Sequence, residues 1–96
     1  MSDPSLIFPD EFEQYAWELE SKGWFGEARL ELQGRRYRLT FYDPARLGQE
    51  IEAELQRGGI FFEPNLVVVP AVTRQNMEKA ATRLVKQASL GLLVAE

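Results

Sequence analysis

The chain has 96 residues, of which 45% are hydrophobic and 27% charged, and its formal net charge is −4. This is the composition of one ordinary globular domain rather than of a disordered or fibrous chain. Cysteine and histidine are both absent, which excludes disulfides, zinc sites of the usual kinds and catalysis by histidine or cysteine. The negative charge also argues against general attraction to nucleic acid or to anionic lipid.

The first ten residues, MSDPSLIFPD, carry two acids, two prolines and an apolar run of only three residues. Such a segment is too short and too polar to form a signal peptide or a membrane span, and we expect a cytoplasmic protein. We expect residues 1–9 to form an N-terminal tail and residues 10–96 to form a single domain.

A first helix is predicted from Asp10 to Lys22. Asp10 can cap it, Glu13 can complete a capping box, and Gly23 ends it. The apolar stripe of this helix consists of Phe12, Tyr15, Ala16 and Leu19.

The stretch GEARLELQGRRYRLTFYD alternates apolar and polar residues, which predicts a β-hairpin. Its apolar face contains Ala28, Leu30, Leu32, Tyr37, Leu39 and Phe41. Its polar face contains Glu27, Arg29, Glu31, Arg36, Arg38, Thr40 and Tyr42. We favour a Gly34-Arg35 turn, which places Glu31 opposite Arg38. A Gln33-Gly34 turn would instead oppose Arg29 and Arg38, two like charges, and would require a positive φ at Gln33.

Three further elements are predicted after the hairpin. Asp43-Pro44 begins a helix that runs to Gly58-Gly59, and its narrow stripe of Leu47, Ile51 and Leu55 indicates that it lies over a sheet edge. The valine-rich run NLVVVP suits a central parallel strand. Thr73 caps a third helix, whose stripe consists of Met77, Ala80, Ala81, Leu84, Val85 and Ala88. The sequence leaves open whether the final LLVAE adds a short strand.

The element order α-β-β-α-β-α predicts the α/β (α+β) class. We expect a two-layer sandwich with the helices on one face of a small mixed sheet.

Three sets of residues resemble functional motifs but have simpler explanations. Glu50 and Glu54 stand one helical turn apart, yet Arg46 and Arg57 compensate both, which favours an ion-pair ladder over a metal site. The glycines of GWFG serve as a helix stop and a strand entry. An anion could bind at the start of the third helix beside Arg74, but Thr73 can already cap it. No catalytic residue, metal ligand or cofactor is predicted, and we expect a non-enzymatic protein.

Arg29, Arg36 and Arg38 beside Tyr42 form the basic and aromatic patch of the chain. A sheet face of this kind can bind single-stranded nucleic acid by stacking and phosphate contacts. Cross-strand ion pairs on a solvated hairpin explain the same arginines.

Trp17 lies on the side of the first helix opposite its apolar stripe, among acidic residues. Two explanations are open for Trp17. It is covered within the chain, by the apolar segment LIF at residues 6–8 or by Trp24-Phe25, or it is a contact site for another protein. Phe61 and Phe62 raise the same alternatives. We therefore predict a protein-interaction domain that acts as a homodimer or as a small acidic protein that neutralises a partner. The alternative is a module that binds single-stranded nucleic acid through the hairpin face, and an enzyme ranks third.

Overall fold

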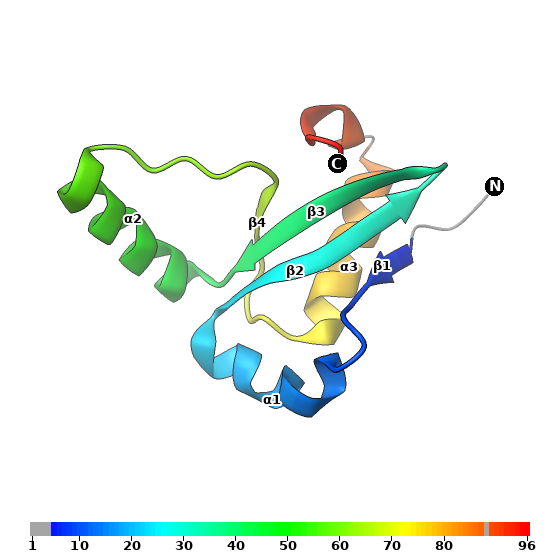
Figure 1. Cartoon of the computed structure of the whole chain (residues 1–96), viewed down its shortest axis with the longest axis horizontal. Helices are drawn as coiled ribbons and strands as arrows, with labels where there is room; N and C mark the ends of the chain where they lie inside the picture. Colours follow the sequence, from blue (N-terminus) through cyan, green and yellow to red (C-terminus); the bar gives the residue numbers. More distant parts are fainter. Residues whose placement is uncertain (1–4, 88) are drawn as a thin grey trace.

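The structure is a computed structural model that describes residues 5–87 and 89–96. Its strands are β1 (Ser5–Ile7), β2 (Trp24–Leu32), β3 (Arg35–Tyr42) and β4 (Leu66–Val68). Its helices are α1 (Phe12–Lys22), α2 (Pro44–Gly58), α3 (Arg74–Lys86) and a short 3₁₀ helix, η1 (Ser89–Leu92). The strands form one mixed sheet in the order β1-β2-β3-β4 (Figure 1). The predicted α+β class is therefore confirmed.

Part of the expected N-terminal tail belongs to the sheet. Strand β1 pairs antiparallel with β2, with Leu6 opposite Leu30. Three residues carry too little periodicity to predict a strand, which is why this one was missed. Residues 1–4 of the expected tail lie outside the described residues.

Helix α1 begins later than predicted, and the capping box is wrong. Its N-cap is Glu11, and the backbone N–H of Phe12 donates to the carbonyl of Pro9 at 3.0 Å. This start places Phe12 at the first helical position, where its side chain is buried in the core. The helix ends at Gly23 as predicted, with a φ of 71° at that glycine.

The hairpin adopts the register that the sequence argued against. Glu31 lies opposite Arg36, and Arg29 lies opposite Arg38. The turn is Gln33-Gly34, with φ values of 52° and 79°. Positive φ at both positions is typical of a type I′ turn, whose twist matches that of the two strands.

Arg29 and Arg38, whose like charges argued against this register, direct their side chains to different acceptors. The Arg29 guanidinium pairs with the Glu96 carboxylate at 3.0 Å, whereas Arg38 Nε donates to the carbonyl of Gly26 at 2.8 Å. Glu31 instead pairs with Arg36 at 2.5 Å. Long side chains can diverge from a shared cross-strand position, so direct opposition of two arginines does not decide the register here.

A β-bulge between Phe25 and Ala28 shifts the register of the hairpin by one residue. Such a bulge reverses the side-chain alternation of the strand beyond it. Phe25 therefore enters the core on the same face as Ala28, although the two are three residues apart. The carbonyl of Gly26, within the bulge, receives its hydrogen bond from Arg38.

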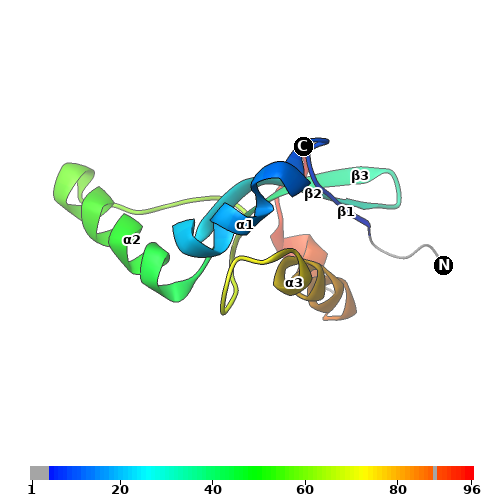
Figure 2. The same ribbon diagram turned by 90° about the horizontal axis from the view of Figure 1, so that it is seen from below.

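One face of the sheet carries the core, which α1 and α3 cover (Figure 2). Phe12 and Leu19 come from α1, and Met77 and Ala81 come from α3. The sheet contributes Phe25, Ala28, Leu30, Tyr37, Leu39 and Phe41. The stripe predicted for α3 is thus partly confirmed, while its last member, Ala88, lies outside the described residues.

Strand β4 and helix α2 are placed differently from the expectation. Strand β4 pairs parallel with β3, as predicted, but it lies at the edge of the sheet rather than at its centre. Helix α2 projects away from the sheet instead of lying over its edge (Figure 1). The core face is already covered by α1 and α3, which leaves α2 outside the core.

The final LLVAE forms no regular strand: Leu92 is the last residue of η1, and residues 93–96 are irregular. It nevertheless lies along β3, because the backbone N–H of Glu96 donates to the carbonyl of Arg36 at 2.8 Å.

We expect Gly23→Ala to lower the free energy of unfolding by about 2 kcal/mol or more. Its positive φ disfavours a side chain, and a Cβ there would lie 2.6 Å from the Asp43 carboxylate. Gly48→Ala in α2 is the matched control, since its Cβ would meet nothing within 4 Å and alanine favours a helix by about 0.5–1 kcal/mol. Urea unfolding of both variants tests this, and equal effects would contradict it.

Gln33→Asn should raise the free energy of unfolding by a few tenths to about 1 kcal/mol, because asparagine tolerates the left-handed conformation of this turn. The same change at Gln49, which is exposed on α2, should be neutral or slightly destabilising. Chemical denaturation of the two variants distinguishes this register from a Gly34-Arg35 turn, where Gln33→Asn would bring no gain.

Candidate interaction surfaces

Helix α2 and residues 59–65, which lead back to β4, form a lobe beside the sheet (Figures 1 and 2). We call residues 44–65 the projecting lobe. Asp43 caps the helix by accepting from the backbone N–H of Arg46 at 2.7 Å, and Gly59 ends it with a φ of 76°, as predicted. None of the residues of α2, all of which the structure describes, is buried. Its apolar stripe is therefore not part of the core.

Tyr42 joins the projecting lobe to the sheet. It is only 4% exposed, and its hydroxyl donates to Glu63 at 2.8 Å. Burial, followed by this hydrogen bond, raises the pKa of the Tyr42 hydroxyl far above its ordinary value. The hydroxyl therefore stays protonated and holds residues 59–65 against the end of β3.

Large apolar side chains lie open on the projecting lobe. Leu55 is 50%, Ile60 67% and Phe62 72% exposed, while Phe61 is partly buried. A groove of about 400 Å³ between α2 and the returning segment is lined by Tyr42, Glu50, Glu54, Ile60, Phe61, Phe62 and Glu63. Glu50 pairs with Arg46 at 2.9 Å and Glu54 with Arg57 at 3.0 Å, as the predicted ion-pair ladder requires.

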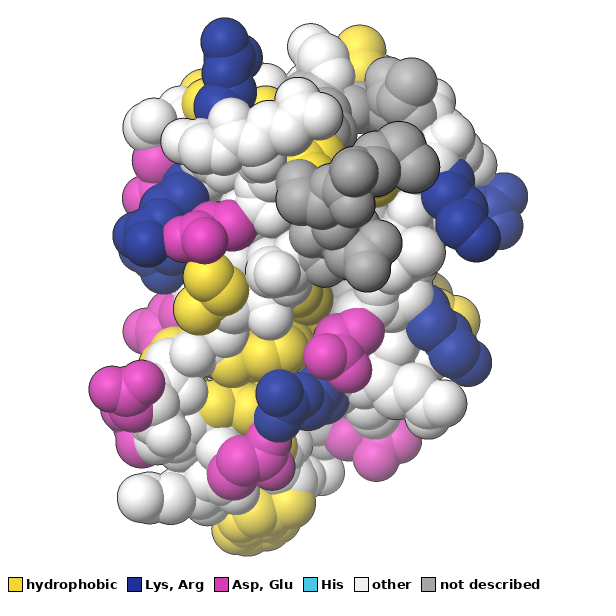
Figure 3. Space-filling model, turned by 90° about the vertical axis from the view of Figure 1, so that its right-hand side faces the viewer, with side chains coloured by type: hydrophobic (Ala, Val, Ile, Leu, Met, Phe, Trp, Pro, Cys, Tyr) yellow, Lys and Arg dark blue, Asp and Glu magenta, His cyan; other side chains and the backbone are white. Residues whose placement is uncertain are grey.

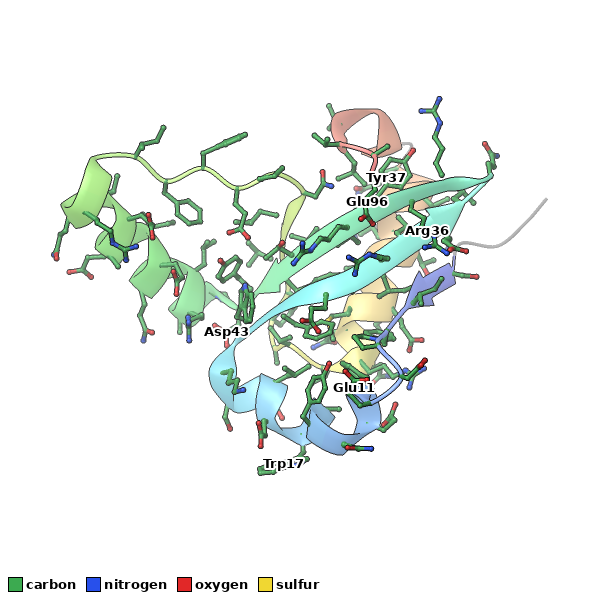
Figure 4. The ribbon with its side chains drawn as sticks, in the orientation of Figure 1. Glu11, Trp17, Arg36, Tyr37, Asp43 and Glu96 are labelled. Carbon is green, nitrogen blue, oxygen red and sulfur yellow. The ribbon has the colours of Figure 1, made fainter. Side chains whose placement is uncertain are left out.

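Trp17 is exposed on the outer side of α1 and points away from the sheet (Figure 4). Its exposed fraction is 75%. The segment LIF does not cover it: Phe8 packs on Phe12 instead, with 4.4 Å between ring centroids. Trp24 lies over Gly26 on β2. Neither LIF nor Trp24-Phe25 covers Trp17, so that explanation is wrong. Trp17 lies on a different surface from Phe61 and Phe62.

Trp17→Ala should lower the free energy of unfolding by less than about 1 kcal/mol, because a side chain this exposed leaves no cavity. Leu19→Ala, two residues along the same helix, removes a buried core side chain and should cost about 2–5 kcal/mol. Thermal or urea unfolding compares the two. A Trp17→Ala loss as large as that of Leu19→Ala would place the indole in the core.

The arginines of the hairpin face all have partners within the chain. Arg29 pairs with Glu96, Arg36 with Glu31, and Arg38 bonds to the Gly26 carbonyl. The expectation that Tyr42 stands exposed beside them is wrong, since the projecting lobe buries it. On the side that carries β1 and the hairpin tip, charges of both signs are interspersed (Figure 3). The hairpin face thus offers neither an exposed tyrosine for stacking nor an unpaired arginine cluster.

The start of α3 is capped as predicted. The Thr73 hydroxyl accepts from the backbone N–H of Asn76 at 3.2 Å. The positive charge of Arg74 is already paired with Glu13 on α1. Its guanidinium also lies 5.0 Å from the centre of the Phe8 ring. These contacts hold α1 and α3 together.

Tyr15 is a feature that the sequence did not reveal. Its hydroxyl is buried and, among the residues that the structure describes, has no hydrogen-bond partner. It borders a small pocket between α1 and β2 that also contains Glu11 and Glu27. Burial, together with the charges of Glu27 and Glu11, raises the pKa of the Tyr15 hydroxyl. The predicted stripe indicated only that Tyr15 faces the core.

The described part of the chain contains no cluster of three potential metal-ligating side chains. No helix of that part is both long enough and apolar enough to cross a membrane. No protein-family model, curated protein or solved structure matches this chain.

Of the residues predicted for contact with a partner, Phe61 and Phe62 lie together on the projecting lobe, and Trp17 lies on α1. The sequence did not show that Leu55 and Ile60 join the first two. Leu55 was assigned to a covered stripe because periodicity reveals an apolar face but not what packs against it.

Proposed function

We propose that this protein is a protein-interaction domain and that the projecting lobe is its main contact surface. The observation that carries the proposal is the set of large apolar side chains, Leu55, Ile60 and Phe62, left open on the projecting lobe. Exposed apolar groups that gather on one projecting element are typical of interaction sites, whereas single scattered ones are not.

The charges of the projecting lobe favour a partner with basic residues around an apolar centre. Residues 44–65 contain Arg46 and Arg57 against Glu50, Glu52, Glu54 and Glu63, for a formal charge of −2. A second copy of this acidic surface would be repelled, while lysine and arginine on a partner would complement it. This supports an acidic protein that binds and neutralises a partner over a homodimer formed through the projecting lobe.

The structure of the projecting lobe also favours binding without a large rearrangement. The cap at Asp43, the positive φ at Gly59 and the Tyr42–Glu63 hydrogen bond hold both segments in place. Ordering costs are therefore small when a partner docks. Phe62 is the expected anchor, because exposed aromatic side chains contribute a large share of binding energy once they are buried.

The test uses the whole chain as bait in an extract of its source cells, followed by measurement of affinity for the captured protein. Combined Ile60→Ser and Phe62→Ser should abolish capture, since loss of a buried aromatic anchor costs about 2 kcal/mol or more. Leu92→Ser is the matched control, because Leu92 is an exposed apolar residue outside the projecting lobe. The captured partner should carry basic residues at the contact.

Light scattering on the purified chain should show a monomer. A dimer that dissociates in the Ile60→Ser, Phe62→Ser variant would replace the heterologous partner with a second copy. Capture that survives this double change but is lost in Trp17→Ser would move the contact surface to α1 and refute the role of the projecting lobe.

A further inference from the structure

The outer edge of β3 is only partly covered by β4. Strand β4 pairs with Thr40, Phe41 and Tyr42, and leaves the first half of β3 beyond its reach. Thr40 donates its backbone N–H to Asn65, and the carbonyl of Tyr42 accepts from Val69. Because backbone groups of alternate residues point to the same edge of a strand, those of Arg36 and Arg38 point to this edge as well.

Residues 94–96 occupy this edge, and we call them the edge segment; Leu93 before them packs against the core. The backbone N–H of Glu96 donates to the carbonyl of Arg36 at 2.8 Å. The Glu96 carboxylate reaches over β3 to Arg29, with 3.0 Å between Oε1 and Nε. Figure 4 shows Glu96 beside Arg36 on the hairpin.

Asn65 clamps the edge segment with its side-chain amide. Its Nδ2 donates to the carbonyl of Arg38 at 2.9 Å and to that of Val94 at 2.8 Å. Its Oδ1 accepts from the backbone N–H of Val94 at 2.7 Å. Asn65 has a φ of 57°, a conformation that asparagine tolerates better than most residues.

The edge segment satisfies this edge incompletely. The edge segment bonds to the Arg36 carbonyl, but among residues 5–87 and 89–96 no hydrogen bond joins it to the backbone N–H groups of Arg36 and Arg38. Val94, Ala95 and Glu96 are all exposed, so little apolar surface holds them down. A regular strand would supply acceptors for both N–H groups, which the edge segment does not.

We propose that this edge of β3 binds an extended, acidic segment of a partner protein, which displaces residues 94–96. The edge segment itself indicates the chemistry, since its backbone bonds to β3 and its glutamate pairs with Arg29. Arg38, whose guanidinium bonds to the neutral carbonyl of Gly26, adds positive charge on the same face. A partner strand would bond to the N–H and carbonyl groups of Arg36 and to the N–H group of Arg38, as in β-strand addition, while Asn65 keeps the Arg38 carbonyl.

The space beside the edge fits such a ligand. A groove of about 380 Å³ lies there, lined by Trp24, Gly26, Arg38 and Thr40 of the sheet, by residues 63–65, and by residues 94–96, which the partner would replace. It can receive a side chain of the added strand on the open face of the sheet. The groove shares residues 63–65 with the projecting lobe but not its exposed apolar side chains, Leu55, Ile60 and Phe62, so different variants test the two proposals.

The probe is a fluorescent, acetylated peptide, Val-Thr-Val-Glu-Val-Thr-amide, titrated into the full chain and followed by anisotropy. Amide resonances of Arg36 and Arg38 should shift, and their hydrogen exchange should slow. A peptide with lysine in place of glutamate should bind at least about tenfold more weakly, as should one whose backbone is N-methylated at alternate residues.

Loosening the edge segment should strengthen peptide binding, because the two compete. Asn65→Gly removes the clamp while glycine keeps the positive φ, and should tighten binding about tenfold. Glu96→Gln breaks only the ion pair with Arg29 and should tighten binding by a smaller factor. Glu52→Gln makes the same charge change on α2 and should have no effect, and neither should Phe62→Ser. If Asn65→Gly does not fold, Glu96→Gln carries the test.

Absence of binding up to about 1 mM peptide, in the natural chain and in the loosened variants, would overturn the proposal. Equal affinity for the lysine or N-methylated peptide would overturn it too, as would affinity unchanged in Asn65→Gly and Glu96→Gln. A single-stranded oligonucleotide that shifts Arg36 and Arg38 where the acidic peptide does not would show that this edge serves nucleic acid instead.

Discussion

The contact between Gly23 and Asp43 fixes the directions of four elements at once. Gly23 ends α1 and leads directly into β2, while Asp43 follows β3 and caps α2. The backbone N–H of Asp43 donates to the carbonyl of Gly23 at 2.9 Å, and the Asp43 carboxylate lies where a side chain at Gly23 would stand. One glycine and one aspartate thus set both the end of the hairpin and the start of the projecting lobe.

The position of the projecting lobe follows from how little sheet is available. Two of the four strands have three residues each, and α1 and α3 already cover the core face. A helix between parallel strands normally packs on the sheet. Here α2 has no such space, and its stripe stays open while Tyr42 and Glu63 hold its base. The exposed apolar surface is thus a consequence of topology rather than of an unusual helix sequence.

The charged residues of the open sheet face mostly serve internal contacts. Arg38 satisfies the carbonyl left free by the bulge at Gly26, and Arg36 holds Glu31 across the hairpin. Of these three arginines, Arg29 pairs with a distant carboxylate, that of Glu96. Exposed pairs of this kind contribute only about 0.2–1 kcal/mol, so this one can exchange for an equivalent pair with a partner at small cost.

The sequence by itself determined the types of the elements from α1 to α3, most helix ends and the α+β class. Apolar periodicity shows which side of each element avoids water. Asp43 and Thr73 cap helix starts and Gly23 and Gly59 end helices, and each acts on residues within one helical turn. Tertiary structure alone decided the hairpin register, the bulge, strand β1 and the openness of α2. The register depended on distant acceptors for Arg29 and Arg38, and the exposure of Leu55 and Phe62 depended on which surfaces α1 and α3 had already covered. Local patterns contain no information about either, because both arise from contacts between residues far apart in the chain.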